Sequence, residues 1–470
     1  MNRRYKSWIS AVIIGALLLT LASCVEKPQA DVDADGWEGK EELELGDRDN
    51  KALRERYEEY RENATLAFST NAPESEELFV TESFGDGVKI VDYTGEASII
   101  VVPETIGGKT VLAIGDAVAG SDIRAISLPD TVTEIDKGAF AGCEKLATLR
   151  IPFVGDGEEM THFGYIFGAD NYEKNSLAIP GSLDMVILGE NVTEIAENAF
   201  AGCKKISAVV LPARIQKIGN FAFYECKDLV YVSSYTALKE VGSYAFGECS
   251  SLYKLELSLA ETIGFGALYG CDSIYSLGLP FVGGSATENR FIGYIFGAEF
   301  ADFNDEFVPR SLYSVSISDT ACRDIPDRAF AGCTYIAEFI FGMQIESIGI
   351  RSFYACRSIR SITLPDAVKT IGDDAFFGCD NLETVELGNG IESIGMQAFY
   401  GCRSLKSVEI PENVTELKPS TFALCASLET VKLNNVKKIG KDAFSKCESL
   451  TPVDCSGIEV GDGNGNLIAE

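Results

Sequence analysis

Eleven cysteines recur at a nearly constant interval and constrain the fold of this 470-residue chain more than any other feature. Eight of the ten intervals are 22 or 23 residues, and the other two, of 60 and 62 residues, equal a normal interval plus an insertion. A fixed interval of this length is typical of a solenoid, in which each repeat buries its apolar face only against its neighbours. The cysteines are Cys143, Cys203, Cys226, Cys249, Cys271, Cys333, Cys356, Cys379, Cys402, Cys425 and Cys447.

The residues around each cysteine predict how one repeat folds. In residues 381–402, the pattern L-x-x-V-x-L that begins at Leu382 matches the strand of a leucine-rich repeat, with its apolar side chains pointing inward. Gly395 permits a tight bend, and Phe399 follows on a short convex turn. The expected fold is an α/β solenoid, namely a right-handed leucine-rich repeat with 22–23-residue rungs, short parallel strands and short convex helical turns.

Stacking of the repeats predicts two buried columns. Equivalent cysteines would have Cβ atoms about 4.8 Å apart, which is longer than the roughly 3.5–4.5 Å of a disulfide, so we expect buried free thiols. Cys455 extends this core, whereas Cys322 lies off the column. The second column is a phenylalanine spine formed by Phe140, Phe200, Phe223, Phe246, Phe330, Phe353, Phe376, Phe399, Phe422 and Phe444.

The recurring phrase I-x-x-I-G-x-x-A-F-x-G-C-x-x-L-x-x-V-x-L-P resembles the BspA-like, or treponemal-type, class of bacterial leucine-rich repeats. The resemblance covers about three quarters of the chain. It implies a cell-surface or secreted location and, in some members, adhesion to host matrix proteins or to other bacteria.

The first residues indicate export. Arg3, Arg4 and Lys6 precede an apolar stretch that is too short for a comfortable transmembrane helix. This stretch ends in Leu-Ala-Ser-Cys24, which resembles a bacterial lipobox and implies cleavage before Cys24 and lipidation of its thiol. The protein would then be lipid-anchored to the bacterial cell envelope, facing outside the cytoplasm. An ordinary secretory signal with a coincidental cysteine is the alternative.

The composition changes along the chain predict five parts. The cap is expected to be a helix and a hairpin that cover the first repeat, because terminal repeats need a polar outer layer. The parts are a lipoprotein signal peptide (1–23), an acidic tether (24–47), the N-terminal cap (48–97), the solenoid (98–455) with insertions at 152–181 and 280–310, and a C-terminal tail (456–470).

A calcium loop and a solvated tether are alternative interpretations of the acidic stretch. Asp31, Asp33, Asp35 and Glu42 have the spacing of EF-hand ligands, but Pro28 stands where an entering helix would be. The expectation is that the protein has no cofactor and no metal site, with calcium at these four residues left open.

Charge and histidine content argue against two classes of function. A formal net charge of −31 repels nucleic acids and anionic lipids, so contact with the membrane is expected only through the lipid anchor. The single histidine, His162, has no neighbouring nucleophile in the sequence, which favours a non-enzymatic protein. The expected partner is a protein of the host matrix or of another cell surface. A glycan ligand or a purely structural role in the envelope is the alternative.

Two surfaces could bind that partner. The insertions share the phrase GYIFGA, which could fold back as a core plug through Phe167 and Phe296, or could present contact aromatics, since aromatics dominate binding hot spots. The contact candidates on the insertions are Phe153, Tyr165, Phe281 and Tyr294. The candidates on the concave strands are Tyr231, Lys254, Glu256, Thr384 and Glu386.

Overall fold

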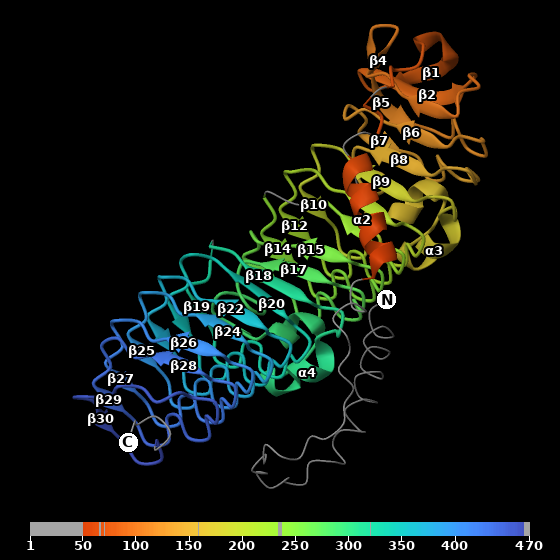
Figure 1. Cartoon of the computed structure of the whole chain (residues 1–470). Coiled ribbons are helices and arrows are strands. Elements are labelled where there is room, and N and C mark those ends of the chain that lie inside the picture. Colours follow the sequence, from red (N-terminus) through yellow and green to blue (C-terminus); the bar gives the residue numbers. More distant parts are fainter. Residues whose placement is uncertain are drawn as a thin grey trace. The chain divides into compact units, whose positions relative to one another are not determined.

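The structure is a computed structural model that describes residues 50–64, 67–69, 71–157, 159–233, 237–319 and 321–464. The predicted signal peptide and tether lie outside these residues, and with them Cys24 and the calcium candidates Asp31, Asp33, Asp35 and Glu42. The described residues form one compact unit, a parallel β-solenoid of about 16 turns with a spacing of about 23 residues (Figure 1).

Each repeat contributes a first strand that carries the L-x-x-L-x-L pattern. Successive first strands pair in parallel, and each residue lies opposite its equivalent in the next repeat, as Ser361 lies opposite Thr384. They form a six-stranded sheet (β13-β11-β9-β8-β6-β3) and two four-stranded sheets (β15-β17-β18-β20 and β22-β24-β26-β28), together called the first-strand face. The bounds are β3 (Ile99–Val101), β6 (Ala125–Ser127), β8 (Thr148–Ile151), β9 (Met185–Leu188), β11 (Ala208–Val210), β13 (Tyr231–Val232), β15 (Lys254–Glu256), β17 (Ser276–Leu279), β18 (Ser314–Ile317), β20 (Glu338–Phe341), β22 (Ser361–Thr363), β24 (Thr384–Glu386), β26 (Ser407–Glu409) and β28 (Thr430–Lys432).

A second, two-residue strand follows in most repeats. Its second residue is usually a buried isoleucine, so the two strands enclose one continuous apolar core. The bounds are β7 (Glu134–Ile135), β10 (Glu194–Ile195), β12 (Lys217–Ile218), β14 (Glu240–Val241), β16 (Thr262–Ile263), β19 (Asp324–Ile325), β21 (Ser347–Ile348), β23 (Thr370–Ile371), β25 (Ser393–Ile394), β27 (Glu416–Leu417), β29 (Lys438–Ile439) and β30 (Glu459–Val460).

The expected convex helical turns are hydrogen-bonded turns and not helices. The residue before the Ala-Phe pair has a positive φ, 55° at Asp374 and 54° at Gln397, which the right-handed helix excludes. The backbone instead bonds sideways to the next repeat: the amide of Phe376 donates to the carbonyl of Ala398 at 2.7 Å. The neighbouring turn therefore supplies hydrogen-bond partners for backbone N–H and C=O groups that would bond to each other within a helix.

The core confirms the phenylalanine spine and the free thiols. Phe376 is fully buried, and its ring stacks on those of Phe353 at 5.0 Å and Phe399 at 5.1 Å. The described cysteines are free, and those of the column are buried. Their thiols also donate hydrogen bonds: Cys379 Sγ lies 3.2 Å from the carbonyl oxygen of Phe353 in the preceding repeat.

The N-terminal part agrees only partly with the expected cap. The hairpin is present as β1 (Phe79–Phe84) and β2 (Gly87–Tyr93), preceded by the short η2 (Glu76–Leu78). It extends the solenoid end, because β2 pairs with β5 (Lys109–Ile114), which also pairs with β4 (Thr105–Ile106) and β7.

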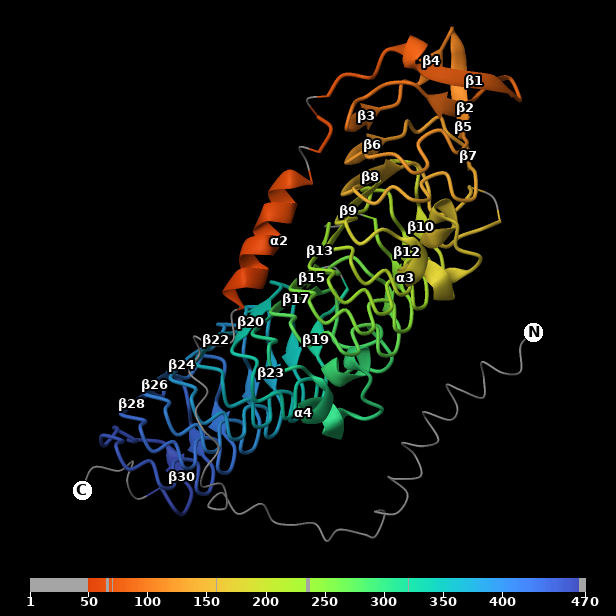
Figure 2. The same cartoon turned by 90° about the vertical axis from the view of Figure 1, so that its right-hand side faces the viewer.

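The predicted helix is α2 (Lys51–Asn63), and it does not cover the first repeat. It lies against the first-strand face beside β9, β13 and β15 (Figure 2). Asn50 caps it through a hydrogen bond from the amide of Leu53 to its side-chain oxygen at 3.2 Å. In the part of the chain that the structure describes, no helix is long and apolar enough to cross a bilayer.

Candidate functional site

Helix α2 covers one part of the first-strand face. The outward side chains there are apolar and buried, and they form a small core separate from the main one with Leu53 and Tyr57. The ring of Tyr57 lies 5.3 Å from that of Tyr231 and 5.8 Å from that of Tyr253. Burial raises the pKa of Tyr57 to about 12, which reflects a phenol removed from water.

Polar contacts fix the position of the helix on the sheet. The hydroxyl of Tyr60 donates to the carboxylate of Asp184, with both oxygens at 2.9 Å. The guanidinium of Arg56 donates to Ser207 Oγ at 3.0 Å. This part of the face is therefore closed by the chain's own N-terminal segment. Tyr231, which we expected to be an accessible aromatic on this face, is buried under α2, and that prediction is wrong.

The other part of the face, over β22 to β28, is open. Its outward side chains are small, polar or charged, and neighbouring repeats link them: Thr363 Oγ1 donates to Glu386 Oε2 at 3.0 Å, and Lys432 Nζ lies 2.5 Å from Glu409 Oε1. The hydrogen bond from Lys432 lowers the pKa of Glu409, so the carboxylate is ionised at neutral pH. We call this the polar strip; its exposed residues are Ser361, Thr363, Thr384, Glu386, Ser407, Glu409, Thr430 and Lys432.

The predicted strand residues are divided between these two parts. Thr384 and Glu386 are exposed in the polar strip. Lys254 and Glu256 on β15 are half-buried, next to the repeats that α2 covers. The structure therefore brings together only part of the predicted strand set.

Each insertion completes a turn of the solenoid. In the first, η3 (Phe163–Phe167) takes the place of an Ala-Phe turn, because the amide of Phe140 donates to Ile166 and that of Phe163 donates to Ala199. Phe167 is 4% exposed, and Phe296 in η5 (Ile292–Phe296) of the second insertion is 1% exposed. The core-plug interpretation of the GYIFGA phrase is thus confirmed for both phenylalanines.

A buried asparagine holds each plug, and the sequence reasoning missed it. The side-chain oxygen of Asn175 accepts from the amide of Gly164 at 2.9 Å, and that of Asn304 accepts from Gly293 at 2.9 Å. Both asparagines are fully buried. The available signal was their identical position, eleven residues after the glycine of GYIFGA in each insertion.

The contact candidates of the insertions differ in exposure. Tyr165, Tyr294 and Phe153 are half-buried against the main core, so part of each surface reaches solvent. Phe281 is 1% exposed, because the chain still follows the core directly after β17. The expectation that Phe281 stays partly exposed is wrong. His162 is 8% exposed, and its Nδ1 lies 3.3 Å from Asn175 Oδ1.

The segments that follow the two plugs have the same order of short helices but different exposed side chains. In the first insertion they are η4 (Tyr172–Lys174) and α3 (Asn175–Ala178); in the second they are η6 (Ala301–Phe303) and α4 (Asn304–Phe307). The second carries three exposed phenylalanines: Phe300, Phe303 and Phe307.

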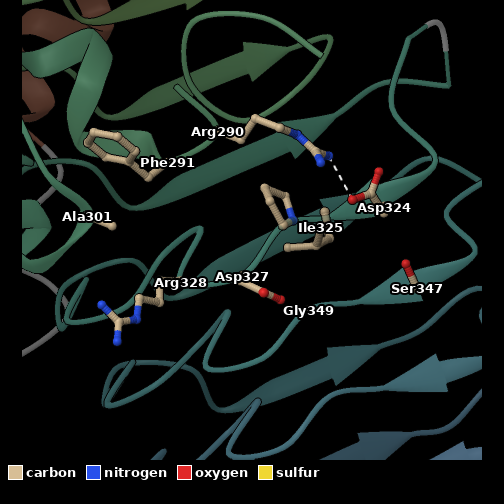
Figure 3. A pocket seen from close by; sticks show the side chains of 10 residues that line it. Arg290, Phe291, Ala301, Asp324, Ile325, Asp327, Arg328, Ser347 and Gly349 are labelled. Atoms are coloured by element: carbon tan, nitrogen blue, oxygen red, sulfur yellow. Dashed lines mark hydrogen bonds and ion pairs between the residues drawn. The ribbon is translucent and has the colours of Figure 1, made fainter. Parts of the chain in front are cut away.

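A hollow of about 460 Å³ lies beside the second insertion. Figure 3 shows Arg290 and Arg328 on either side of it, with Arg290 paired to Asp324 at 2.7 Å. Ala301 of η6 and Pro326 contribute apolar lining. No cluster of three His, Cys, Asp or Glu residues in the described ranges is placed to hold a metal ion.

Comparison with known proteins identifies the repeat. The family model described as BspA type leucine rich repeat region matches residues 114–156, 173–291 and 307–456, with six copies. A search of curated proteins found no match.

Solved structures of similar chains include a leucine-rich repeat protein from Bacteroides ovatus (23% identity, 79% of this chain and 91% of that chain, TM-score 0.33). A leucine-rich cell surface protein from Faecalibacterium prausnitzii is 22% identical over 85% of this chain and 97% of that chain, with a TM-score of 0.29. The pneumococcal vaccine antigen PcpA is 19% identical over 82% of this chain and 96% of that chain, with a TM-score of 0.27.

Proposed function

The chain belongs to the BspA-type leucine-rich repeat family, and from this premise we propose that it is a non-enzymatic module that binds a protein partner at the bacterial surface. A repeat scaffold of this kind presents a long, ordered surface at little conformational cost. The partner class that we propose is a protein of the host matrix or of another cell surface.

The polar strip is the observation that carries this proposal. Its exposed side chains are held in place by contacts between neighbouring repeats, such as the hydrogen bond from Thr363 to Glu386 at 3.0 Å and the ion pair of Lys432 with Glu409 at 2.5 Å. The hydrogen bond from Lys432 lowers the pKa of Glu409, so this carboxylate keeps its negative charge at neutral pH. A preorganised polar surface loses little freedom on binding, which favours affinity.

The surface location rests on the N-terminal sequence. We propose that the signal peptide is removed before Cys24, that the lipid on this cysteine anchors the protein, and that the acidic residues that follow form a tether before the solenoid. Such a tether would hold the polar strip away from an anionic membrane surface, because the membrane repels the carboxylates of the tether.

A glycan ligand is the second candidate, and the exposed aromatics of the second insertion favour it. Phe300 is 61% exposed, and aromatic rings are common platforms for sugar rings. A purely structural role in the envelope would require no ligand on either surface.

A binding screen separates these candidates. The purified chain is tested against matrix proteins and polysaccharides, together with a Thr384→Ala/Glu386→Ala variant and a Tyr165→Ala/Tyr294→Ala variant. Because truncation of a central contact commonly costs about 2 kcal/mol or more, we expect at least one variant to bind a matrix protein about thirtyfold more weakly. Unchanged melting temperatures are the control for folding. Binding of polysaccharides alone would contradict the proposal.

A further inference from the structure

The two insertions can be compared with each other, because they have the same backbone arrangement but different exposed side chains. Residues 170–178 and 299–307 have the same order of short helices and nearly the same pattern of buried and exposed positions around the buried Asn175 and Asn304. The exteriors differ: Phe300, Phe303 and Phe307 of the second insertion stand where the first has Asn171, Lys174 and Ala178. The plug does not require these phenylalanines, since the first insertion folds without them.

The phenylalanines form an apolar patch. Phe300 is 61% exposed, Phe303 41% and Phe307 37%, and the rings of Phe300 and Phe303 lie 6.2 Å apart. Tyr269, 39% exposed, continues the patch, because a Cβ added at Gly297 would lie 3.0 Å from its ring and 3.7 Å from Phe307. Clustered exposed aromatics are typical of a contact surface, whereas single exposed apolar residues are ordinary.

The same segment is strongly acidic. Four exposed carboxylates lie between residues 299 and 307, and this range contains no lysine or arginine. In the part of the chain that the structure describes, one of the four is in an ion pair, Asp302 with Arg328 at 3.0 Å. The equivalent range of the first insertion has two acids and one lysine, a net charge of −1 compared with −4. The four residues are Glu299, Asp302, Asp305 and Glu306.

The hollow adjoins this surface. Ala301 of η6 lines it, and Arg328, the partner of Asp302, stands at its rim (Figure 3). Phe291, Ile325 and Pro326 give it an apolar wall. A side chain from a polypeptide seated on the patch therefore has a recess to enter.

We propose that residues 299–307 and Tyr269, called the acidic-aromatic patch, dock a cationic amphipathic segment of a polypeptide. The apolar face of such a segment covers the three phenylalanines, and its lysines and arginines lie near the carboxylates around them. This inference rests on the proposed function, that the chain binds a protein, and assigns the site and the chemistry of the partner.

Charge disfavours the other occupants. A second copy of the chain carries the same formal charge of −31 and is repelled, as are nucleic acids and anionic glycans. A neutral glycan could stack on the rings and donate hydroxyl groups to the carboxylates, but it carries no positive charge to complement a net charge of −4. A cationic apolar segment is attracted by both components of the surface.

The test measures binding of a synthetic helical peptide of leucine and lysine to the full chain, with a leucine–glutamate peptide as the charge control. Two variants dissect the patch: Phe300→Asn/Phe303→Asn/Phe307→Ala keeps every acid, and Glu299→Gln/Asp305→Asn/Glu306→Gln keeps every phenylalanine. We expect each variant to bind about tenfold or more weakly, and the wild-type affinity to fall as salt rises from about 50 to about 500 mM.

The first insertion supplies a matched gain-of-function control. Asn171→Phe/Lys174→Phe/Ala178→Phe places the same rings on the equivalent backbone and should add a second, weaker site for the leucine–lysine peptide. All altered positions are exposed or half-buried, so the melting temperatures should stay unchanged. Wild-type affinity in both loss variants, equal binding of the glutamate peptide, or dimerisation through the patch would overturn the proposal.

Failure of this inference is distinguishable from failure of the proposed function. If both loss variants bind the peptide and a matrix protein as the wild type does, the patch is not the site, while the chain remains a protein binder. If the wild type binds a neutral polysaccharide through the phenylalanines and no polypeptide, both proposals are wrong.

Discussion

At the scale of single residues, each position in a repeat is dictated by the residue above and below it. The glycine of the Ile-Gly pair illustrates this: a Cβ added at Gly395 would lie 2.4 Å from the carbonyl carbon of Gly372 in the preceding repeat. The thiol of Cys402 likewise donates to Phe376 at 3.3 Å, so cysteine supplies both apolar volume and a donor. Small residues are therefore required here by stacking, beyond the local bend that we expected.

Replacement of Phe376 by alanine tests the spine. The ring is fully buried between two stacked rings, so its removal leaves a cavity and should lower the free energy of unfolding by roughly 3–5 kcal/mol. Urea denaturation followed by circular dichroism measures the loss. Met396→Ala, at an exposed position of the next repeat, is the control. Equal midpoints for the two variants would show that the spine does not support the fold.

His162 makes the first insertion sensitive to pH. Asn175 Oδ1 only accepts hydrogen bonds, so its contact with His162 requires a proton on Nδ1. Burial lowers the pKa of the imidazole and outweighs the hydrogen bond with Asn175, which raises it; Lys137 also lowers the pKa, whereas Asp156 and Asp170 raise it. The unfolded chain therefore binds the proton more readily, and stability falls as pH decreases below about 6.5. His162→Gln should lose less stability than the wild type between about pH 7 and about pH 5. An equal loss of stability in the wild type and the variant between the two pH values, measured by denaturation, would contradict this.

At the scale of elements, the insertions and α2 depend on a few polar residues and rings. The amide of Gly293 is satisfied by Asn304, and removal of a buried partner costs about 1–3 kcal/mol. Asn304→Ala should therefore loosen η5 and α4 and speed hydrogen exchange at Gly293. Asp305→Ala, one residue along and exposed, is the control. Unchanged exchange at Gly293 would show that the asparagine does not hold the plug.

Helix α2 stays folded because it is docked. A 13-residue helix is marginal alone in water, and Tyr57 supplies its central contact with Tyr231 and Tyr253. Tyr57→Ala should weaken docking by roughly 2–4 kcal/mol and expose the apolar part of the first-strand face. Hydrogen exchange of α2 amides measures this, with the exposed Glu59→Ala as the control. Protected α2 amides in the Tyr57 variant would show that the helix is held elsewhere.

At the scale of the whole molecule, charge and anchoring decide where the solenoid acts. With a formal charge of −31, the chain has no electrostatic attraction to an anionic membrane, so attachment is predicted to depend on Cys24. Cys24→Ala should move the protein from the membrane fraction to the soluble fraction, or leave it uncleaved. Cell fractionation and the mass of the mature N-terminus measure this. Membrane attachment without Cys24 would contradict the lipoprotein prediction.

The sequence by itself determined the repeat, its apolar columns and the places of the two insertions. These features are periodic. The same residue pattern occurs in many repeats and identifies the buried positions, such as Phe376 and Cys379. The exposed residues of the polar strip, such as Thr384 and Glu386, follow from the same alternation along a strand.

Only the tertiary structure decided which parts of the surface remain open. The alternation of a strand shows which side chains point outward, but not whether another segment covers them: Tyr231 points outward and is buried under Tyr57, which lies far away in the sequence. The hydrogen bonds by which Asn175 and Asn304 hold the two plugs, and the placement of α2, also depend on the tertiary structure. Such contacts join non-repeating segments, and because each occurs once or twice, no periodicity signals them; the free energy gained by covering apolar side chains selects them in the folded chain.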